Sequence, residues 1–402
     1  MGKQERAMNR GAEKAQATGV RSAMVFIVLI GVVSFFADMT YEGARSITGQ
    51  FLATLGASGA VVGFVAGFGE LAGYAIRLVS GLATDRTRRY WTITIGGYLI
   101  NLGAVPLLAL AGRWEIAAGL MIAERIGKGI RNPVRDAMLS HASSEVGRGW
   151  GFGLHQAMDS TGAMIGPLIV AAVLYFKGTY NSGFALLLIP AAMAVAVLVS
   201  AMFLYPHPED LEISLPELET GGFPKIYWLY LAGMALVAAG YADFALIGYH
   251  FEKGLVVSTH WIPVFYSVAM GVEAICALAL GRLFDRIGLR VIILAVLVSS
   301  VFAPLVFLGG FGASLLGMAL WGLGTGAHES VMRAAVASMS PRDRRATAYG
   351  IFNMGFGVFW FLGSFVMGVL YDISISWLVV FSMACQFASA PLFFAVTRKS
   401  EP

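Results

Sequence analysis

Ionisable side chains occur inside long apolar stretches of this chain, where a charge is costly unless it has a partner or a function. Carboxylates, arginines and a histidine at such positions can bind protons, cations or the charged groups of a passing molecule. The first half of the chain holds most of them. We expect a substrate or proton pathway lined by Asp38, Glu42, Arg45, Glu70, Arg77, Glu124, Arg125, His155, Asp159, Asp243 and Glu273.

Proton binding is one chemistry that this set could perform. A carboxyl group removed from water favours its protonated form, whereas a nearby arginine favours the ionised form. A carboxylate that meets Arg125 in only one of two conformations would change its proton affinity during a cycle, which is what coupling requires. Asp159 is the first candidate, because His155 lies one turn away and could pass the proton on; Glu70 is the second. The alternative is a permanent ion pair that holds the helices together.

Glu124 and Arg125 are neighbours in the sequence, and adjacent side chains on a helix point in different directions. We therefore expect each to find a partner on another helix, with Glu70 or Asp159 as the partner of Arg125.

Other ligands remain open at the same positions. Metal cations could be bound by oxygen and nitrogen atoms from Asp38, Glu42, Glu70, His155 and Asp159. No spacing specifies a metal site, so the metal is left unknown. A carboxylate or phosphate could instead be bound by Arg45, Arg77 and Arg125.

Other function classes lack a signature in the sequence. No P-loop and no Ser-His-Asp arrangement stands out, so we expect no covalent catalysis and no cofactor beyond a proton or cation as coupling ion. Basic residues form no block of the kind that binds nucleic acid. Cys276 and Cys385 lie in apolar runs and are interpreted as small buried hydrophobic residues.

The composition identifies the elements that must position these residues. Of the 402 residues, 57% are hydrophobic and only 13% are charged, whereas soluble domains carry roughly 25% charged residues. A helix needs about 20 apolar residues to cross a bilayer. Twelve such stretches occur near residues 22–44, 59–82, 91–111, 115–134, 150–175, 182–204, 226–249, 260–283, 290–308, 312–334, 346–370 and 376–396. We predict an all-α membrane protein with twelve transmembrane helices, embedded in lipid as a monomer.

Basic residues in short loops predict the orientation, because they concentrate on the cytoplasmic side. Alternate loops hold Arg86, Arg88, Arg89, Arg131, Arg135, Arg148, Arg282, Arg286, Arg290, Arg342, Arg344 and Arg345. The opposite side offers mainly Arg113, Lys177 and Lys253. Both termini are therefore expected in the cytoplasm, with the protein in the cell membrane, or the inner membrane of a bacterium.

An acidic stretch in the middle of the chain suggests the domain organisation. We expect a cytoplasmic tail over 1–21, one six-helix bundle over 22–205, a cytoplasmic linker over 206–225, a second bundle over 226–397 and a short tail over 398–402.

A repeated loop sequence supports two equivalent halves. Gly81-Leu-Ala-Thr-Asp85-Arg86-Thr-Arg88-Arg89 follows the second stretch, and Gly281-Arg-Leu-Phe-Asp285-Arg286-Ile-Gly288 follows the eighth. Pseudo-symmetric six-helix halves around a central path are a known plan of transporters. The duplicated charges favour a conformational latch that holds the halves together in one state, made by Gly81, Asp85, Arg86, Arg89, Gly281, Asp285 and Arg286.

These motifs resemble those of the major facilitator superfamily over essentially the whole chain. The family's loop motif is Gly-x-Leu-Ala-Asp-Arg-x-Gly-Arg-Arg, and Arg88 stands where the first copy should have glycine. A second family motif resembles Arg125-Ile-Gly-Lys-Gly129. A third, typical of antiporters, resembles the helix-packing glycines and proline of the fifth stretch, Gly153, Gly162, Gly166 and Pro167, with Val170 and Ala171 in place of its final glycines.

The resemblance implies a secondary active transporter that works by alternating access. The antiporter motif and the buried carboxylates favour proton-coupled export of a small organic molecule or drug. Two alternatives are a transporter of a metal or inorganic cation, and uptake of an organic anion or phosphate-bearing metabolite. Apolar walls of the pathway are expected from second-half aromatic residues such as Phe251, Trp261, Phe265, Tyr266, Trp321, Phe356, Phe359 and Trp360.

Overall fold

The computed structural model describes residues 2–146, 148–206, 223–332, 335–336, 339 and 345–400. Within these ranges every regular element is a helix and no strand occurs, which confirms the predicted all-α class. The predicted linker over 206–225 lies almost wholly outside the described residues.

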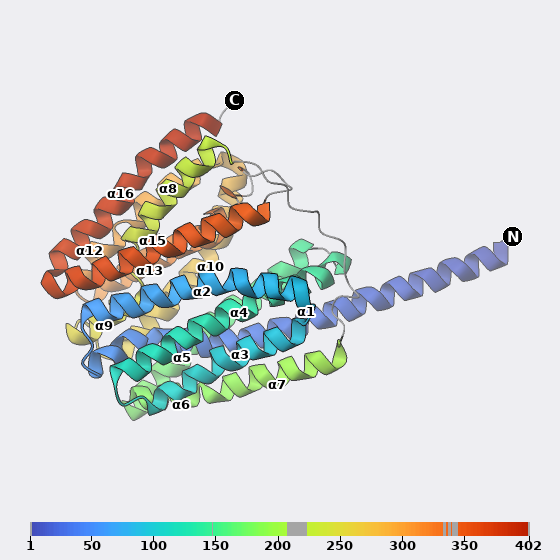
Figure 1. Ribbon diagram of the computed structural model, residues 1–402, viewed down its shortest axis with the longest axis horizontal. Helices are drawn as coiled ribbons and strands as arrows, with labels where there is room; N and C mark the ends of the chain where they lie inside the picture. Colours follow the sequence, from blue (N-terminus) through green and yellow to red (C-terminus); the bar gives the residue numbers. More distant parts are fainter. Residues whose placement is uncertain are drawn as a thin grey trace.

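Each half of the chain forms a bundle of helices (Figure 1). The first bundle comprises α1 (Gly2–Thr54), α2 (Gly59–Thr87), α3 (Tyr90–Leu107), η1 (Leu108–Leu110), α4 (Trp114–Val146), α5 (Arg148–Lys177), α6 (Tyr180–Leu186) and α7 (Leu188–Leu204). The second comprises α8 (Lys225–Gly240), α9 (Phe244–Lys253), α10 (Trp261–Ile287), α11 (Arg290–Ser299), α12 (Phe302–Phe307), α13 (Phe311–Ala327), η3 (His328–Met332), α15 (Arg345–Ile373) and α16 (Ile375–Ser400). In the described residues five crossings consist of two helical segments each, namely α3–η1, α6–α7, α8–α9, α11–α12 and α13–η3.

Ten helical stretches in the described part of the chain are long and apolar enough to cross a membrane. The two further crossings of the twelve-helix plan are α4 and α13 with η3. Helix α4 is less apolar because it carries Glu124, Arg125, Lys128 and Arg131 within two turns. Helix α13 gives way after 17 residues to η3, a single π-helical turn.

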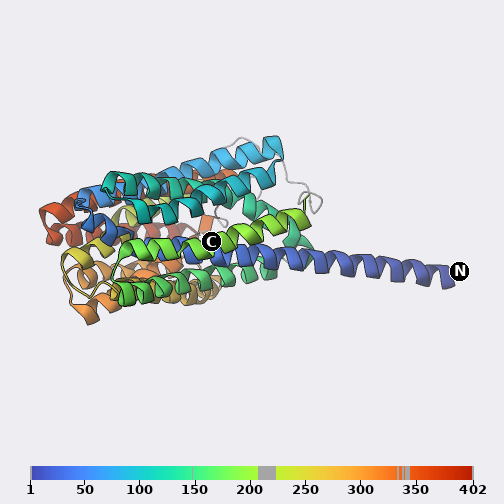
Figure 2. The ribbon, with the colours of Figure 1, turned by 90° about the horizontal axis from the view of Figure 1, so that it is seen from below.

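Helix α1 is much longer than the predicted first crossing. It spans 53 residues, which corresponds to about 80 Å at roughly 1.5 Å per residue. Its apolar part runs over Ser22–Thr54. The preceding residues, expected as a tail, continue the same helix and project beyond the bundle in both views (Figures 1 and 2).

The two bundles meet through equivalent helices. Helix α2 packs against α15, and its counterpart α10 packs against α5, the counterpart of α15. The last turns of α1 add contacts with α9. These pairings follow the pseudo-symmetry of the two halves, and they place the ends of helices from both halves around a shared centre.

Glycines allow the α2–α15 pair to touch through the backbone. Gly63 lies against the carbonyl oxygen of Ser364, and Gly368 lies against the carbonyl oxygen of Gly59. A Cβ on Gly67 would come 2.9 Å from the Cα of Phe361. These close approaches lie where α2 begins and α15 ends, so the halves are tightly closed at that end of the molecule. We call this contact the glycine seam.

Asp372 reinforces the glycine seam from the second half. Its carboxylate accepts hydrogen bonds from the backbone N–H groups of Gly59, at 2.9 Å, and Ala60, at 2.8 Å. These groups belong to the first turn of α2, where N–H groups lack partners within the helix. One half therefore caps a helix of the other.

Candidate functional site

A cavity of about 540 Å³ lies between the two halves. It extends from mid-depth towards the end opposite the glycine seam, reaching Arg135 and Asp136 on α4 and Tyr349 near the start of α15. Of the predicted pathway residues it is lined by Asp38, Glu42, Arg45, Glu70, Arg77, Arg125, Asp159 and Glu273. It is thus closed at one face of the molecule and open towards the face from which α1 projects.

Glu124 and Asp243 lie on a separate, much smaller cavity of about 30 Å³. This space has room for about one water molecule. Arg45 and Arg125 line both cavities and so separate them.

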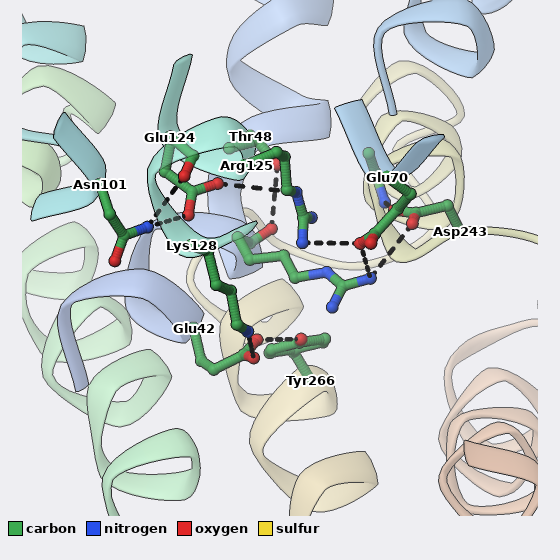
Figure 3. Close-up of polar contacts among 11 residues, drawn as sticks. Glu42, Thr48, Glu70, Asn101, Glu124, Arg125, Lys128, Asp243 and Tyr266 are labelled. Carbon is green, nitrogen blue, oxygen red and sulfur yellow. Dashed lines mark hydrogen bonds and ion pairs between the residues drawn. The ribbon is translucent and has the colours of Figure 1, made fainter. Parts of the chain in front are cut away.

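A chain of ion pairs crosses the molecule beside the large cavity (Figure 3). Asp243 caps α9 by accepting from the N–H of Ala245 at 2.9 Å, and its other oxygen lies 3.1 Å from Nη2 of Arg45. Nη2 of Arg45 is also 3.7 Å from Oε1 of Glu70. The same glutamate oxygen is 2.7 Å from Nη1 of Arg125. The Arg45–Asp243 contact joins the two halves.

The chain continues into the first half through Glu124. Its Oε2 lies 3.6 Å from Nε of Arg125, and its Oε1 accepts a hydrogen bond from Nδ2 of Asn101 at 2.5 Å. Glu124 and Arg125 also lie within ion-pair distance of each other although adjacent side chains point in different directions, because the arginine side chain is long enough to bend back along the helix. Asn101 is the partner on another helix, and sequence reasoning missed it.

A second polar link between the halves involves Glu42. Its Oε2 accepts a hydrogen bond from the hydroxyl of Tyr266 on α10 at 2.5 Å. Its Oε1 lies 3.7 Å from Nζ of Lys128, which sits 3.5 Å from the centre of the Tyr41 ring. Tyr266 was expected as part of an apolar wall; instead it donates to a carboxylate. The position of Lys128 in an apolar stretch was a signal that could have been used.

Asp38 on α1 and Asp159 on α5 both line the large cavity, and we call them the acidic pair. Nη2 of Arg131 lies 3.5 Å from Oδ1 of Asp38. Asp159 interacts electrostatically with Asp38, and its buried Oδ1 has no hydrogen-bond partner among the described residues. Arg131 was expected in a cytoplasmic loop, but α4 continues beyond it and the residue is fully buried.

His155 does not contact the acidic pair through a hydrogen bond in the part of the chain that the structure describes. Its Nε2 lies 2.7 Å from Oγ of Ser34, and the same hydroxyl lies 3.3 Å from Nη1 of Arg135. Arg135 in turn donates two hydrogen bonds to Asp136. A relay from Asp159 to His155 therefore stays a prediction.

Aromatic rings from the second half form the facing wall of the cavity. Trp321, Phe352, Phe356 and Trp360 line it, together with Tyr349. The other expected wall residues do not reach it: Phe251 and Phe265 are fully buried in the core, and Trp261 and Phe359 are exposed on the outside of the bundle. The first-half wall is therefore charged, and the second-half wall is mainly aromatic, with Glu273 and His328 beside the rings.

The fifth-stretch motif is only partly a packing motif. Gly162 and Gly166 lie against the backbone of α1 at Phe35 and Met39, so that α1 and α5 approach closely. Pro167 is buried within α5. Gly153, however, is exposed, and a Cβ there would meet no described atom within 4 Å, so it makes no close packing contact with the described residues.

The latch residues lie at the open face. The side chains of Asp85 and Asp285 are outside the described residues, while Arg86, Arg89 and Arg286 are exposed. A Cβ added at Gly81 or at Gly281 would meet no described atom within 4 Å. Arg88 takes a left-handed conformation, with φ of 54° and ψ of 20°. Its counterpart Gly288 also has a positive φ, 64°, but its ψ is −145°, so the two loop copies differ in backbone conformation. The latch itself stays a prediction.

The described residues contain no group of three or more His, Cys, Asp or Glu side chains that could hold a metal ion.

Comparisons with known proteins cover nearly the whole chain. The family model described as Major Facilitator Superfamily matches residues 27–273 and 252–402. An uncharacterized protein of Mycobacterium tuberculosis is 40% identical over 382 residues, which are 93% of each chain. An uncharacterized MFS-type transporter of Methanocaldococcus jannaschii is 26% identical over 361 residues, 87% of this chain and 89% of that relative.

A solved structure shares the fold. It is a bacterial homolog of the human lysosomal transporter Spinster in an inward-facing and occupied conformation, and it has a TM-score of 0.76 to this chain at 14% identity. The match covers 92% of this chain and 96% of that one.

Proposed function

The chain belongs to the Major Facilitator Superfamily and is a multi-pass membrane transporter, and from that premise we propose that it exports a small organic molecule in exchange for protons. It would act as a monomer that alternates between two states, each open to one side of the membrane. The observation that carries the proposal is the cavity of about 540 Å³ between the halves, with a charged wall facing an aromatic one.

The size and lining of the cavity favour an organic substrate. Pockets for small organic ligands typically measure about 300–1,000 Å³ and combine apolar rings with a few polar groups. Rings such as Phe356 and Trp360 offer flat apolar surface to a molecule, which a hydrated metal ion would not use. The aromatic wall therefore favours an organic substrate over an inorganic cation.

The acidic pair of Asp38 and Asp159 supports proton coupling. Two ionised carboxylates side by side repel each other, and a shared proton removes the repulsion. Asp38 is already held by Arg131, so Asp159 is the member whose charge is less compensated. A movement of α1 against α5, which carry the two residues, would separate the pair and release the proton.

Export is supported by the fifth-stretch motif, whose pattern is typical of antiporters. Its Gly162 and Gly166 hold α5 against α1, the two helices that carry the acidic pair. The motif would thereby couple the position of α5 to the distance between the carboxylates.

Reconstituted liposomes containing a pH-sensitive dye provide the test. An imposed gradient of a substrate, found by screening aromatic acids, aromatic amines and divalent metals, should drive protons the opposite way. Asp159→Asn should abolish proton movement while leaving substrate exchange between the two sides detectable. Glu115→Gln serves as the matched control, because Glu115 is an exposed carboxylate paired with Arg113.

Three results would overturn the proposal. Unchanged proton movement in Asp159→Asn would place coupling elsewhere, and transport restricted to a divalent metal would favour the cation alternative. Accumulation of the substrate in right-side-out vesicles with a more acidic exterior, and none in inside-out vesicles with a more acidic interior, would replace export by uptake.

A further inference from the structure

We infer that the transported molecule is a planar aromatic acid whose anionic group binds Arg77 while its ring lies against the aromatic face of α15. The inference rests on the proposed function, because it assigns a substrate class to the same cavity. It concerns what binds, and it does not depend on the coupling ion or on the direction of transport.

Arg77 differs from the other cationic residues of the cavity in having no carboxylate within ion-pair distance of it among the described residues. Among the described residues, the arginines and lysines that line it are Arg45, Arg77, Arg125, Lys128 and Arg135. Carboxylates lie within 4.0 Å of four of them, since Arg45 contacts Asp243, Arg125 contacts Glu70, Lys128 contacts Glu42 and Arg135 contacts Asp136. In the described part of the chain, Arg77 forms no such pair.

Arg77 is nevertheless held in place. Its guanidinium carbon lies 4.7 Å from the centre of the Tyr74 ring, one turn earlier on α2. Its Nε is buried and has no hydrogen-bond partner among the residues described. A buried donor without a partner is costly, and a charged acceptor is the partner that compensates it best. A guanidinium also presents parallel N–H groups that match the two oxygens of a carboxylate or phosphate.

The Tyr74 ring that contacts Arg77 lies next to the aromatic wall of the cavity. The centroid of Tyr74 lies 6.4 Å from that of Phe356, which is on α15 in the other half. On α15, Phe352, Phe356 and Trp360 follow one another at intervals of four residues, so they share one helix face. Their consecutive centroids are 6.0 and 5.5 Å apart, with interplanar angles of 25° and 37°. We call these three rings the aromatic face.

The far end of the aromatic face carries an unused donor. Trp360 is only 7% exposed. Its indole Nε1 is buried and has no hydrogen-bond partner within the described residues. A buried tryptophan N–H usually finds an acceptor. A hydroxyl, carbonyl or ring nitrogen on the substrate would supply one. The cavity is thus lined by a cation at one end, by rings in the middle and by Trp360, whose buried N–H has no described partner, at the other end.

Binding measurements on the purified protein test this assignment without any gradient. The probes are 4-hydroxybenzoate, 4-hydroxyphenyl phosphate, the uncharged 4-hydroxybenzamide and the cationic 4-hydroxybenzylamine, followed by quenching of tryptophan fluorescence and by calorimetry. The wild type should bind one or both acids and bind the amide and the amine more weakly. Whichever acid binds more tightly identifies the oxyanion as carboxylate or phosphate, and either result supports the inference.

Variants locate the contacts. Arg77→Gln should weaken acid binding on the order of tenfold to a hundredfold, which is the range for loss of a charged hydrogen-bond partner. Binding of the amide should change little, and Arg77→Lys should recover part of the loss. Trp360→Phe should weaken the binding of probes with a ring hydroxyl more than the binding of benzoate, which lacks one. Arg113→Gln, which alters an exposed arginine away from the cavity, is the matched control.

Acid affinity unchanged in Arg77→Gln, or tighter binding of the amine than of either acid, would overturn the inference. The result is separable from the test of proton coupling. Arg77-dependent acid binding without proton movement would uphold the substrate class and reject the coupling. Proton-coupled transport of an amine would do the reverse.

Discussion

Glu42 and Arg45, one turn apart on α1, each make a polar link between the halves at mid-depth. Glu42 accepts from Tyr266 at 2.5 Å, and Arg45 lies 3.1 Å from Asp243. We expect both links to break when the closed face opens, since each joins a helix of the first half to one of the second. A short segment of α1 therefore connects the charge network to the relative position of the bundles.

Removal of Arg45 should destabilise the protein, because it leaves Asp243 buried and unpaired. Breaking a buried pair costs about 3–5 kcal/mol of unfolding free energy. We expect Arg45→Gln to lower the thermal unfolding midpoint in detergent, and the double variant with Asp243→Asn to recover much of it. Asparagine also caps helices well, so α9 keeps its first-turn hydrogen bond.

The exposed pair of Arg113 and Glu115 supplies the comparison for that experiment. Pairs at the surface contribute about 0–1 kcal/mol, so Arg113→Gln should leave the midpoint nearly unchanged. Equal midpoints for Arg45→Gln and Arg113→Gln, or no recovery in the double variant, would contradict a paired Asp243.

The sequence predicted which residues are charged at membrane depth but only part of their pairing. Glu70 was one of two expected partners of Arg125, and the two lie 2.7 Å apart. Tyr266 and Asn101 were not expected to contact carboxylates, because a single tyrosine or asparagine in an apolar run fits packing as well as bonding. Which side chains meet depends on helix rotation and register, and hydropathy carries no information on either.

Element boundaries were predicted best where composition changes abruptly. The second crossing was expected over 59–82, and the apolar part of α2 spans Gly59–Thr84. Helix α4 was expected to end near 134 but runs to Val146, because its ion pairs allow charged residues to remain within the bundle. The charge cluster that looked like a loop is the continuation of a crossing.

An added methyl group at the glycine seam should disfavour the closed face. At Gly63 a Cβ would overlap the carbonyl oxygen of Ser364, so α2 and α15 could not approach as they do here. We expect Gly63→Ala to shift the population towards the state open at that face. A cysteine placed at Ser160 in the cavity should then react more slowly with a reagent supplied from the opposite face.

Gly103 on α3 provides the matched control for the seam. A Cβ there would meet nothing within 4 Å, and alanine in place of glycine favours a helix by roughly 0.5–1 kcal/mol. Gly103→Ala should therefore fold well and leave the reactivity at position 160 unchanged. If Gly63→Ala behaves in the same way, the seam does not determine the equilibrium.

At the scale of the whole molecule the two halves differ in chemistry although they share a layout. The first half supplies most of the ion-paired residues, with Asp243 added from the second half, and the second half supplies the aromatic face. Because both walls belong to one cavity, a rocking movement of the halves would change the distance between charge and rings. A substrate that needs both would bind well only when they are close together.

The orientation of the molecule remains a prediction from its loop charges. We expect both termini in the cytoplasm, and the cavity would then open inwards. With Cys276 and Cys385 replaced by alanine, a cysteine at Lys177 should react with an impermeant maleimide in intact cells. A cysteine at Ser400 should react only after permeabilisation. The reverse pattern would invert the topology and, with it, the direction of the open face.

Hydrogen exchange at the backbone amides that bond to Asp372 can report on the transport cycle. The amide protons of Gly59 and Ala60 are bonded to Asp372 while the glycine seam is closed. When the seam opens, these amides face water and would exchange with deuterium much faster, since exchange requires a broken hydrogen bond. Mass spectrometry of a peptide covering residues 57–64 would then report, without any introduced label or mutation, how often the closed face opens. A bound ligand that favours one state would register there as a change in isotope uptake.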